Sequence, residues 1–196
     1  MRSGLSRRLP RMGPPPLEQH VSRRRMTENM DRNSLLAAGR AVLAHEGLYL
    51  DERRWDDWLA LYCEDCEFWA PAWKDDTEMT DDPNREISIF YFKSRAGLED
   101  RVWRIRSGEA PSLNPLPRTT HQITNSVLAD GATADAMTLH SAWTCHVFSL
   151  RNKTQHVFFG RNRHELARID GDWRIRRKKI VLMNDYVPGM VDVFCV

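Results

Sequence analysis

Apolar and polar positions in the first half of the chain follow helical spacing, then strand spacing, then helical spacing again. Apolar residues recur every three to four positions over 33–48 and over 51–63, which predicts two amphipathic helices. Residues 66–73 and 87–92 are rich in aromatic and β-branched side chains, which favour strands. The helical pattern returns over 95–107 and predicts a third helix.

Long strand patterns dominate the second half of the chain. They are separated by turn sequences such as Asp130-Gly131 and Asp170-Gly171-Asp172. Helices followed by long strands are typical of an α+β fold, in which helices cover one face of an antiparallel sheet. We therefore predict N-terminal helices packed on a curved, mostly antiparallel sheet that wraps round them as a cone. The predicted strands are 118–129, 134–149, 155–168 and 173–187.

Charge divides the chain into two predicted regions. Residues 1–25 hold seven arginines against one acid, Glu18, and carry +6, whereas the whole chain carries +2. The remaining 22 basic and 26 acidic residues therefore carry −4. The first segment has little to bury and contains Pro14-Pro15-Pro16, so we predict a disordered basic tail over 1–28 and one domain over 29–196. An organelle transit peptide and a translational start at Met26 are the alternative explanations of this segment.

Several classes of function are disfavoured by composition. The folded region is mildly acidic, so nucleic acid is not an expected partner. No apolar run approaches the ~20 residues that span a bilayer, and no secretory signal begins the chain, so we expect a cytoplasmic protein without a membrane segment. The cysteines are then expected to be free thiols. We interpret Cys63-Glu64-Asp65-Cys66 as a structural pair, with half a zinc site or a redox pair as the alternatives.

Short motifs in a fixed order give the chain a family resemblance over residues 33–196. It resembles the small (β) subunit of bacterial aromatic-ring-hydroxylating dioxygenases, especially the benzoate and anthranilate type. Beyond the tryptophan- and tyrosine-rich second helix, the motifs that carry the resemblance are Phe68-Trp69-Ala70-Pro71, Arg85-Glu86-Ile87-Ser88, Gly97-Leu98-Glu99-Asp100-Arg101-Val102, Arg118-Thr119-Thr120-His121 and Asn184-Asp185-Tyr186.

This resemblance implies a fold, partners and a role. The fold is a nuclear-transport-factor-2-like cone. The implied partner is a large (α) subunit that bears a Rieske iron–sulfur cluster and a mononuclear iron, in a hexamer with three of each subunit. A reductase delivers electrons from NADH, and the α subunit adds dioxygen to an aromatic acid to give a cis-dihydrodiol. The β subunit itself is implied to be structural and non-catalytic.

Iron ligands are missing from the sequence itself. A Rieske cluster needs two cysteines and two histidines, usually as Cys-x-His and Cys-x-x-His, but here Cys145 is followed directly by His146. No two histidines stand beside an acid at the spacing that a mononuclear iron site on a helix requires. We therefore expect no cofactor and no metal in this chain, and the resemblance assigns the cluster, the iron and NADH to the partner components.

An alternative function remains open, because cone folds also serve isomerases and dehydratases with an acid–base pair in the pocket. The candidate residues for this reading are Asp57 or its neighbour Asp56, Tyr62, His121 and Asp185. A buried aspartate beside aromatic rings would have a raised pKa, which suits proton abstraction. The structural explanation is that Asp56 and Asp57 are solvated acids of a helix, and that His121 and Asp185 form hydrogen bonds in the core or at an interface.

Partner contacts have their own candidates. Arg101, Arg104 and Arg118 offer guanidinium groups that pair well with carboxylates of a partner. Trp73 belongs to a class of side chain that is enriched at interface centres. Because the chain ends on the apolar run that contains Phe194, we expect this end to pair as a strand or to pack at a subunit contact.

Overall fold

The computed structural model describes residues 17–108, 111, 114–184 and 191–196, with side chains described from residue 31 onward. Residues 35–196 form one compact unit, and residues 1–34 are grouped separately from it. The predicted boundary between a tail at 1–28 and a domain at 29–196 stays a prediction, because much of the proposed tail lies outside the described residues.

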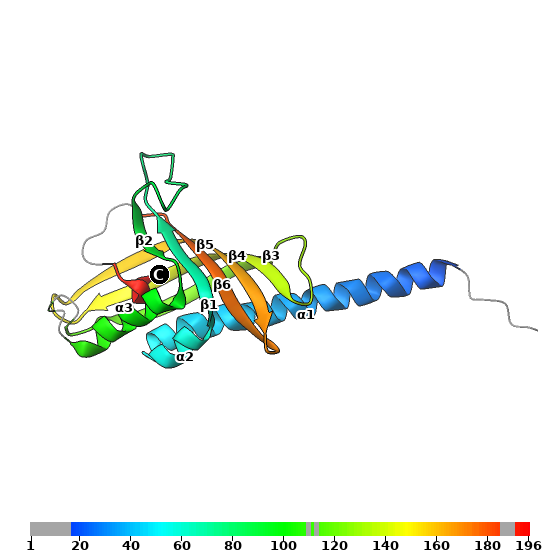
Figure 1. The fold of residues 1–196 in the computed structure, drawn as a ribbon, viewed down its shortest axis with the longest axis horizontal. Helices are drawn as coiled ribbons and strands as arrows, with labels where there is room; N and C mark the ends of the chain where they lie inside the picture. Colours follow the sequence, from blue (N-terminus) through cyan, green and yellow to red (C-terminus); the bar gives the residue numbers. More distant parts are fainter. Residues whose placement is uncertain (1–16, 109–110, 112–113, 185–190) are drawn as a thin grey trace, which may run out of the picture. The chain divides into compact units, whose positions relative to one another are not determined.

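Three helices supply one layer of the compact unit (Figure 1). Helix α1 runs over Leu17–Asp51, α2 over Trp55–Ala60 and α3 over Arg95–Ser107. The bounds of α3 match the predicted range, and its buried side chains, Leu98, Val102 and Ile105, recur at helical spacing. Among the described residues, the helices are too polar or too short to cross a membrane.

The six strands of the described residues form one sheet in the order β2-β1-β6-β5-β4-β3. Only the β1–β6 pairing is parallel, so the sheet is mostly antiparallel, as predicted. The strands are β1 (Tyr62–Pro71), β2 (Ser88–Phe92), β3 (Arg118–Leu128), β4 (Ala136–Ser149), β5 (Thr154–Ile169) and β6 (Asp172–Leu182).

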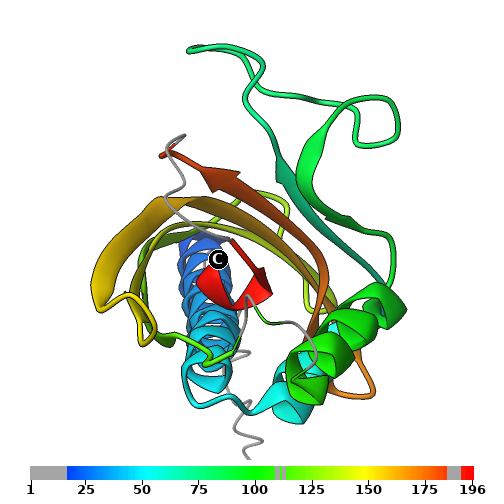
Figure 2. The same ribbon diagram turned by 90° about the vertical axis from the view of Figure 1, so that its left-hand side faces the viewer.

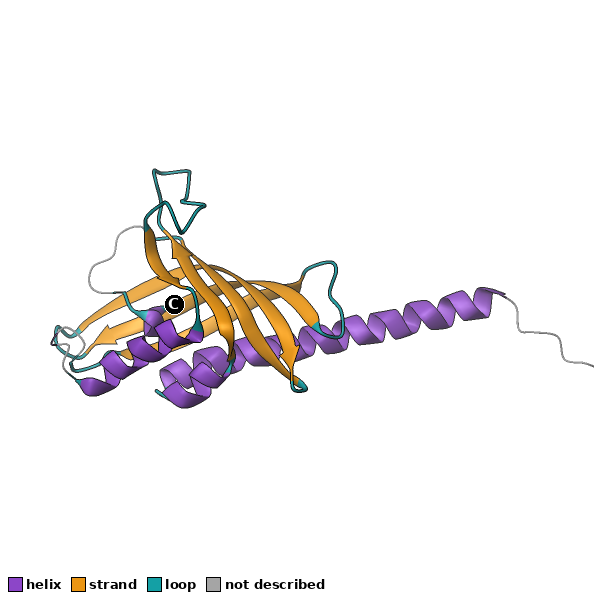
Figure 3. Cartoon of the chain, viewed as in Figure 1, coloured by secondary structure: helices purple, strands orange, loops and turns teal. Residues whose placement is uncertain are grey.

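The sheet curves round the helical layer and encloses the core (Figure 2). Alternation places even-numbered residues of β5 from Phe158 to Leu166 inside and odd-numbered residues from Val157 to Arg163 outside. Helix α3 lies beside β1 and β2 at the opening of the curve (Figure 3). The predicted α+β architecture is therefore confirmed.

Two predicted helices have other bounds in the structure: the helix predicted over 33–48 is part of α1, and the helix predicted over 51–63 is α2, which spans Trp55–Ala60. The helical pattern of 51–63 includes Tyr62, but α2 ends at Ala60 and Tyr62 begins β1. Strand pairing competes for this backbone, because the amide of Ile175 donates to the carbonyl of Leu61 at 2.7 Å. The ring of Tyr62 still packs against Trp58, with ring centroids 5.2 Å apart. Tyr62 is therefore buried beside Trp58, as the helical spacing predicted, although it belongs to a strand.

Two glycines are required by the geometry of the fold. Gly108 ends α3 in the left-handed region, with φ +68°, where other residues are strained. At Gly160 the β5 backbone passes so close to β6 that a Cβ atom would lie 1.9 Å from the carbonyl oxygen of Val181. A side chain at position 160 would therefore push the two strands apart.

Candidate functional site

The interior of the curved sheet holds a cluster of four buried polar side chains. The carboxylate of Glu46 on α1 lies 3.0 Å from Nζ of Lys178 on β6 and 3.0 Å from Nε2 of His164 on β5. The hydroxyl of Tyr62 on β1 donates to the same carboxylate. All four residues are at most 2% exposed. Since buried charges are tolerated only when they are paired and hydrogen-bonded, this cluster joins α1 to three strands.

Electrostatics inside this cluster favour an ionised Glu46. Burial raises the pKa of Glu46, but the Lys178 ammonium and the His164 imidazole outweigh burial and hold that pKa well below its ordinary value. Burial lowers the pKa of His164, and the neighbouring carboxylate does not fully compensate. Burial and the Glu46 carboxylate together raise the pKa of the Tyr62 hydroxyl. The neutral phenol and imidazole thus act as hydrogen-bonding partners of one ion pair.

The C-terminal residues close this interior from the open side. They form the 3₁₀ turn η2 (Val193–Cys195), which Figure 2 shows inside the curve of the sheet. The Arg101 guanidinium binds both oxygens of Asp192, at 2.7 Å each, and Asp192 is fully buried. Nζ of Lys178 also donates to the carbonyl of Val196 at 3.3 Å. The expectation that this end pairs as a strand was wrong, because Val193–Cys195 form a 3₁₀ turn. Phe194 is 4% exposed and packs within the chain's own core.

The residues of the acid–base alternative are each bound to a different partner. Asp57 lies on the surface of α2 and pairs with Arg54 at 2.8 Å, and its neighbour Asp56 pairs with Arg106 at 2.7 Å. Tyr62 belongs to the buried cluster. His121 pairs with Asp51, a residue that sequence reasoning did not select. Asp185 lies outside the described residues.

The cysteines occupy apolar surroundings. All four are buried and free, and Cys63 and Cys66 both lie in β1. Burial raises the pKa of Cys66 to about 12 and also raises the pKa of Cys63, so neither thiol favours the thiolate that redox chemistry and zinc binding need. Within the described part of the chain, no three histidines, cysteines or acids gather as metal ligands would.

The predicted interface residues divide into two groups. Arg101 and Phe194 are used within the chain, because Arg101 holds Asp192 and Phe194 fills the core. Arg104 and Arg118 are exposed, on α3 and on β3. Trp73 is half-buried just after β1, and its indole donates to the carbonyl of Leu182 at the end of β6 at 2.8 Å.

Exposed apolar side chains gather near this tryptophan, which sequence reasoning did not foresee. Val157 is 40% exposed, Phe159 47% and Met183 40%. The amide of Met183 donates to the carbonyl of Phe159 at 2.9 Å, which places the two side by side. We call Trp73, Val157, Phe159 and Met183 the rim patch. The strand alternation that exposes Val157 and Phe159 was the signal available in the sequence.

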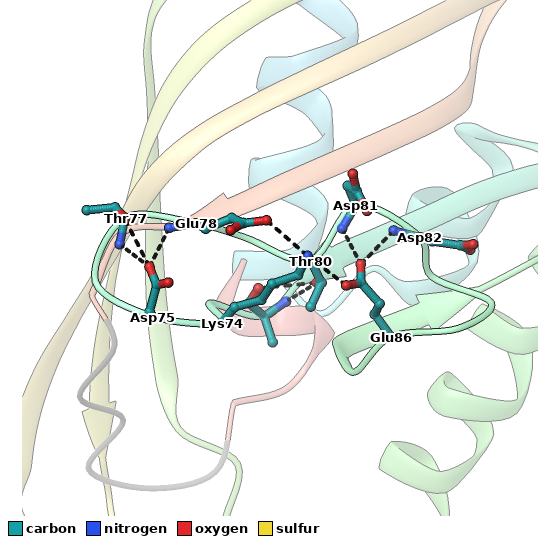
Figure 4. Close-up of polar contacts among 9 residues, drawn as sticks. Lys74, Asp75, Thr77, Glu78, Thr80, Asp81, Asp82 and Glu86 are labelled. Atoms are coloured by element: carbon teal, nitrogen blue, oxygen red, sulfur yellow. Dashed lines mark hydrogen bonds and ion pairs between the residues drawn. The ribbon is translucent and has the colours of Figure 1, made fainter.

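The loop between β1 and β2 directly follows Trp73 of the rim patch and is held together by hydrogen bonds and ion pairs (Figure 4). Nζ of Lys74 lies 2.7 Å from Glu86 and 3.2 Å from Glu78. The other oxygen of Glu86 accepts the amides of Asp81 and Asp82 at 2.7 and 3.0 Å. The loop is therefore an ordered, acidic projection.

Comparisons with known proteins agree with this architecture. Residues 45–189 match the family model described as ring hydroxylating beta subunit. The chain is 38% identical to the toluate 1,2-dioxygenase subunit beta of Pseudomonas putida, over 80% of this chain and 95% of that protein. It is 38% identical to the anthranilate 1,2-dioxygenase small subunit of Acinetobacter baylyi, over 74% of this chain and 86% of that protein.

A solved structure extends the match to three dimensions. The crystal structure of the beta subunit of benzoate 1,2-dioxygenase from Burkholderia mallei superposes with a TM-score of 0.68 at 32% identity. The superposition covers 82% of this chain and 96% of that one. Sequence, family model and fold lead to one assignment: the chain belongs to the family of ring-hydroxylating dioxygenase beta subunits.

Proposed function

We propose that this chain braces an iron-bearing large subunit that cis-dihydroxylates an aromatic acid of the benzoate or anthranilate kind, and that it contributes no catalytic group of its own. The named relatives are subunits of toluate, anthranilate and benzoate dioxygenases, which supports an aromatic acid as the substrate of the assembly. The cluster, the iron and the NADH-dependent step then belong to partner components in the cytoplasm.

The buried polar cluster and the C-terminal turn inside the sheet are the observations that support this proposal. In an enzyme of this fold, the inside of the sheet would need room for a substrate. Here that space holds the ion pair of Glu46 and Lys178, which is closed off by the turn around Phe194. A buried cluster of ion-paired and hydrogen-bonded side chains stabilises and orients elements, which suits a supporting subunit.

The rim patch is the proposed contact with the large subunit. Aromatic and apolar side chains are enriched at the centres of protein interfaces, and this patch lies on the outer face of the sheet. Arg118 projects from the same face. It pairs with Phe148 on β4, and His146, two residues before Phe148 and therefore on the same face of that strand, pairs with Val157. Its guanidinium is available to a carboxylate of the partner. A hexamer of three large and three small subunits is the proposed assembly.

Affinity purification of the tagged full-length chain from its native host tests the proposal. We expect an equimolar large subunit that carries iron and sulfide. The Phe159→Asp variant places a charge in the rim patch and is expected to lose the partner, whereas Val127→Asp, at an exposed position outside the patch, is expected to keep it. An iron-free homo-oligomer in the wild-type preparation would overturn the function.

A second variant tests the position of the interface separately from the function. Trp103 on α3 is 67% exposed and is the other aromatic side chain open to solvent in the described residues. If Trp103→Asp releases the large subunit and Phe159→Asp does not, the contact lies on α3 beside Arg104 instead of on the rim patch.

A further inference from the structure

A groove between α1 and the edge strand β3 lies apart from the buried cluster and from the rim patch. Its cavity volume is about 640 Å³, within the roughly 300–1,000 Å³ of small-molecule pockets. Its apolar stretch is formed by Ala44, Gly47, Leu48 and Ile123. Arg40 lines the groove on α1 eleven residues before Asp51, and His121 lines it on β3.

One end of the groove is organised by Asp51 and His121. Oδ1 of Asp51 lies 2.6 Å from Nδ1 of His121, and Oδ2 accepts the backbone amide of His121 at 2.8 Å. The hydroxyl of Thr119 also donates to Asp51, at 2.9 Å. Because an ionised carboxylate only accepts hydrogen bonds, it fixes the imidazole proton on Nδ1 and leaves Nε2 as an acceptor.

This acceptor is the unexplained atom of the groove. The His121 side chain is 5% exposed, and Nε2 has no hydrogen-bond partner within the described part of the chain. A buried polar atom without a partner is costly and calls for an explanation, such as a ligand that donates to it. A hydroxyl group would satisfy Nε2.

The other end of the groove is positively charged. Nη2 of Arg40 donates to the carbonyl of Ser126 at 2.8 Å, which holds the side chain at the groove while its other N–H groups remain available. Guanidinium groups pair with carboxylates through two parallel hydrogen bonds. The eleven residues from Arg40 to Asp51 span about 16 Å of helix, so a ligand must be elongated to use both ends.

We propose that this groove binds an elongated aromatic acid, with its carboxylate on Arg40, its ring against Leu48 and Ile123, and a hydroxyl group at the far end donating to Nε2 of His121. The proposal is independent of the function of the assembly, because it rests on the contacts of this groove alone. It assigns the chain a ligand site of its own, outside the interior of the sheet.

Titration of the isotopically labelled full-length chain with 4-hydroxycinnamate tests the proposal by NMR. Two matched probes each lack one end: cinnamate has no hydroxyl group, and the methyl ester of 4-hydroxycinnamate has no carboxylate. Each loss is expected to weaken binding about tenfold, which corresponds to one well-made hydrogen bond to a buried or charged group. The shifted amides are expected to include Gly47 and Ile123.

Variants assign each end of the ligand to one residue. In Arg40→Gln the acid and the ester should bind alike, and in His121→Phe the hydroxyl group should give no advantage, while His140→Gln, an exposed histidine elsewhere, should match the wild type. Equal binding of the three probes to the wild type overturns the proposal, as does the absence of saturable shifts up to roughly 10 mM. The probe comparison needs only the wild-type chain, so a variant that fails to fold leaves the test intact.

Discussion

Replacing Glu46 by glutamine removes one negative charge from the centre of the fold and keeps the shape of the side chain. Lys178 is then left 2% exposed, and its ammonium group keeps two described neighbours, the main-chain oxygen of Val196 at 3.3 Å and the ring of Phe68, whose centroid lies at 5.3 Å. Removing one member of a buried ion pair costs about 3–5 kcal/mol, because the other charge stays buried and uncompensated. This is a large share of the ~5–15 kcal/mol that stabilises a typical protein.

The expected change is therefore large enough to measure without ambiguity. A loss of 1 kcal/mol lowers the Tm of a domain of this size by about 2–4 °C, so Glu46→Gln should lower it by roughly 6–20 °C. Urea unfolding followed by circular dichroism gives the free energy of unfolding directly. The matched control is Glu78→Gln, which breaks an exposed pair with Lys74 and should cost at most about 1 kcal/mol.

A double variant separates the buried charge from a general packing defect. Adding Lys178→Met to Glu46→Gln removes the uncompensated ammonium, so part of the lost free energy of unfolding should return. The reasoning is refuted if Glu46→Gln costs no more than Glu78→Gln, or if the second substitution only adds to the loss.

Three further outcomes follow from the same contacts. Gly160→Ala should destabilise the chain by about 3 kcal/mol or more, because its Cβ would meet a backbone carbonyl of β6 at 1.9 Å; an unchanged urea midpoint would contradict the close approach. Arg101→Met leaves Asp192 buried without its partner, so thiol labelling of Cys195, which is 1% exposed, should accelerate on the order of 100-fold, and an unchanged labelling rate would contradict this anchoring. Because the pKa of His164 is lowered in the fold, the folded state binds fewer protons, and stability should fall as pH drops below its unfolded value of about 6.5; replacing His164 by glutamine should flatten this part of the profile between about pH 6.5 and 5.

Periodicity predicted most elements because local spacing and final burial agree in them. The helix at α3 was found over its full range, since Leu98, Val102 and Ile105 recur on one face and all three are buried. The end of the second helix was missed because the β1–β6 pairing, a contact over more than a hundred residues, takes the backbone at Leu61.

The candidate sites could not be predicted where they depend on contacts between residues that are far apart in the sequence. The ion pair of Glu46 and Lys178 and the pair of Asp51 and His121 join residues 132 and 70 positions apart, and spacing gives no signal for either. Arg101 was selected as a charge for a partner, but the structure gives it an internal acid, Asp192. Sequence patterns show which side chains carry charge, whereas only the fold shows whether that charge is already paired.

The most direct test of the account compares turnover and metal content of the chain alone with those of the assembly. We predict that the isolated chain holds no stoichiometric iron and converts no aromatic acid, and that benzoate is oxidised with NADH only when the large subunit and the reductase are present. Asp57→Asn and Tyr62→Phe, which alter residues of the acid–base alternative, should then leave turnover per assembled complex unchanged. Stoichiometric iron in the isolated chain, or conversion of an aromatic acid by the chain alone, would contradict the account.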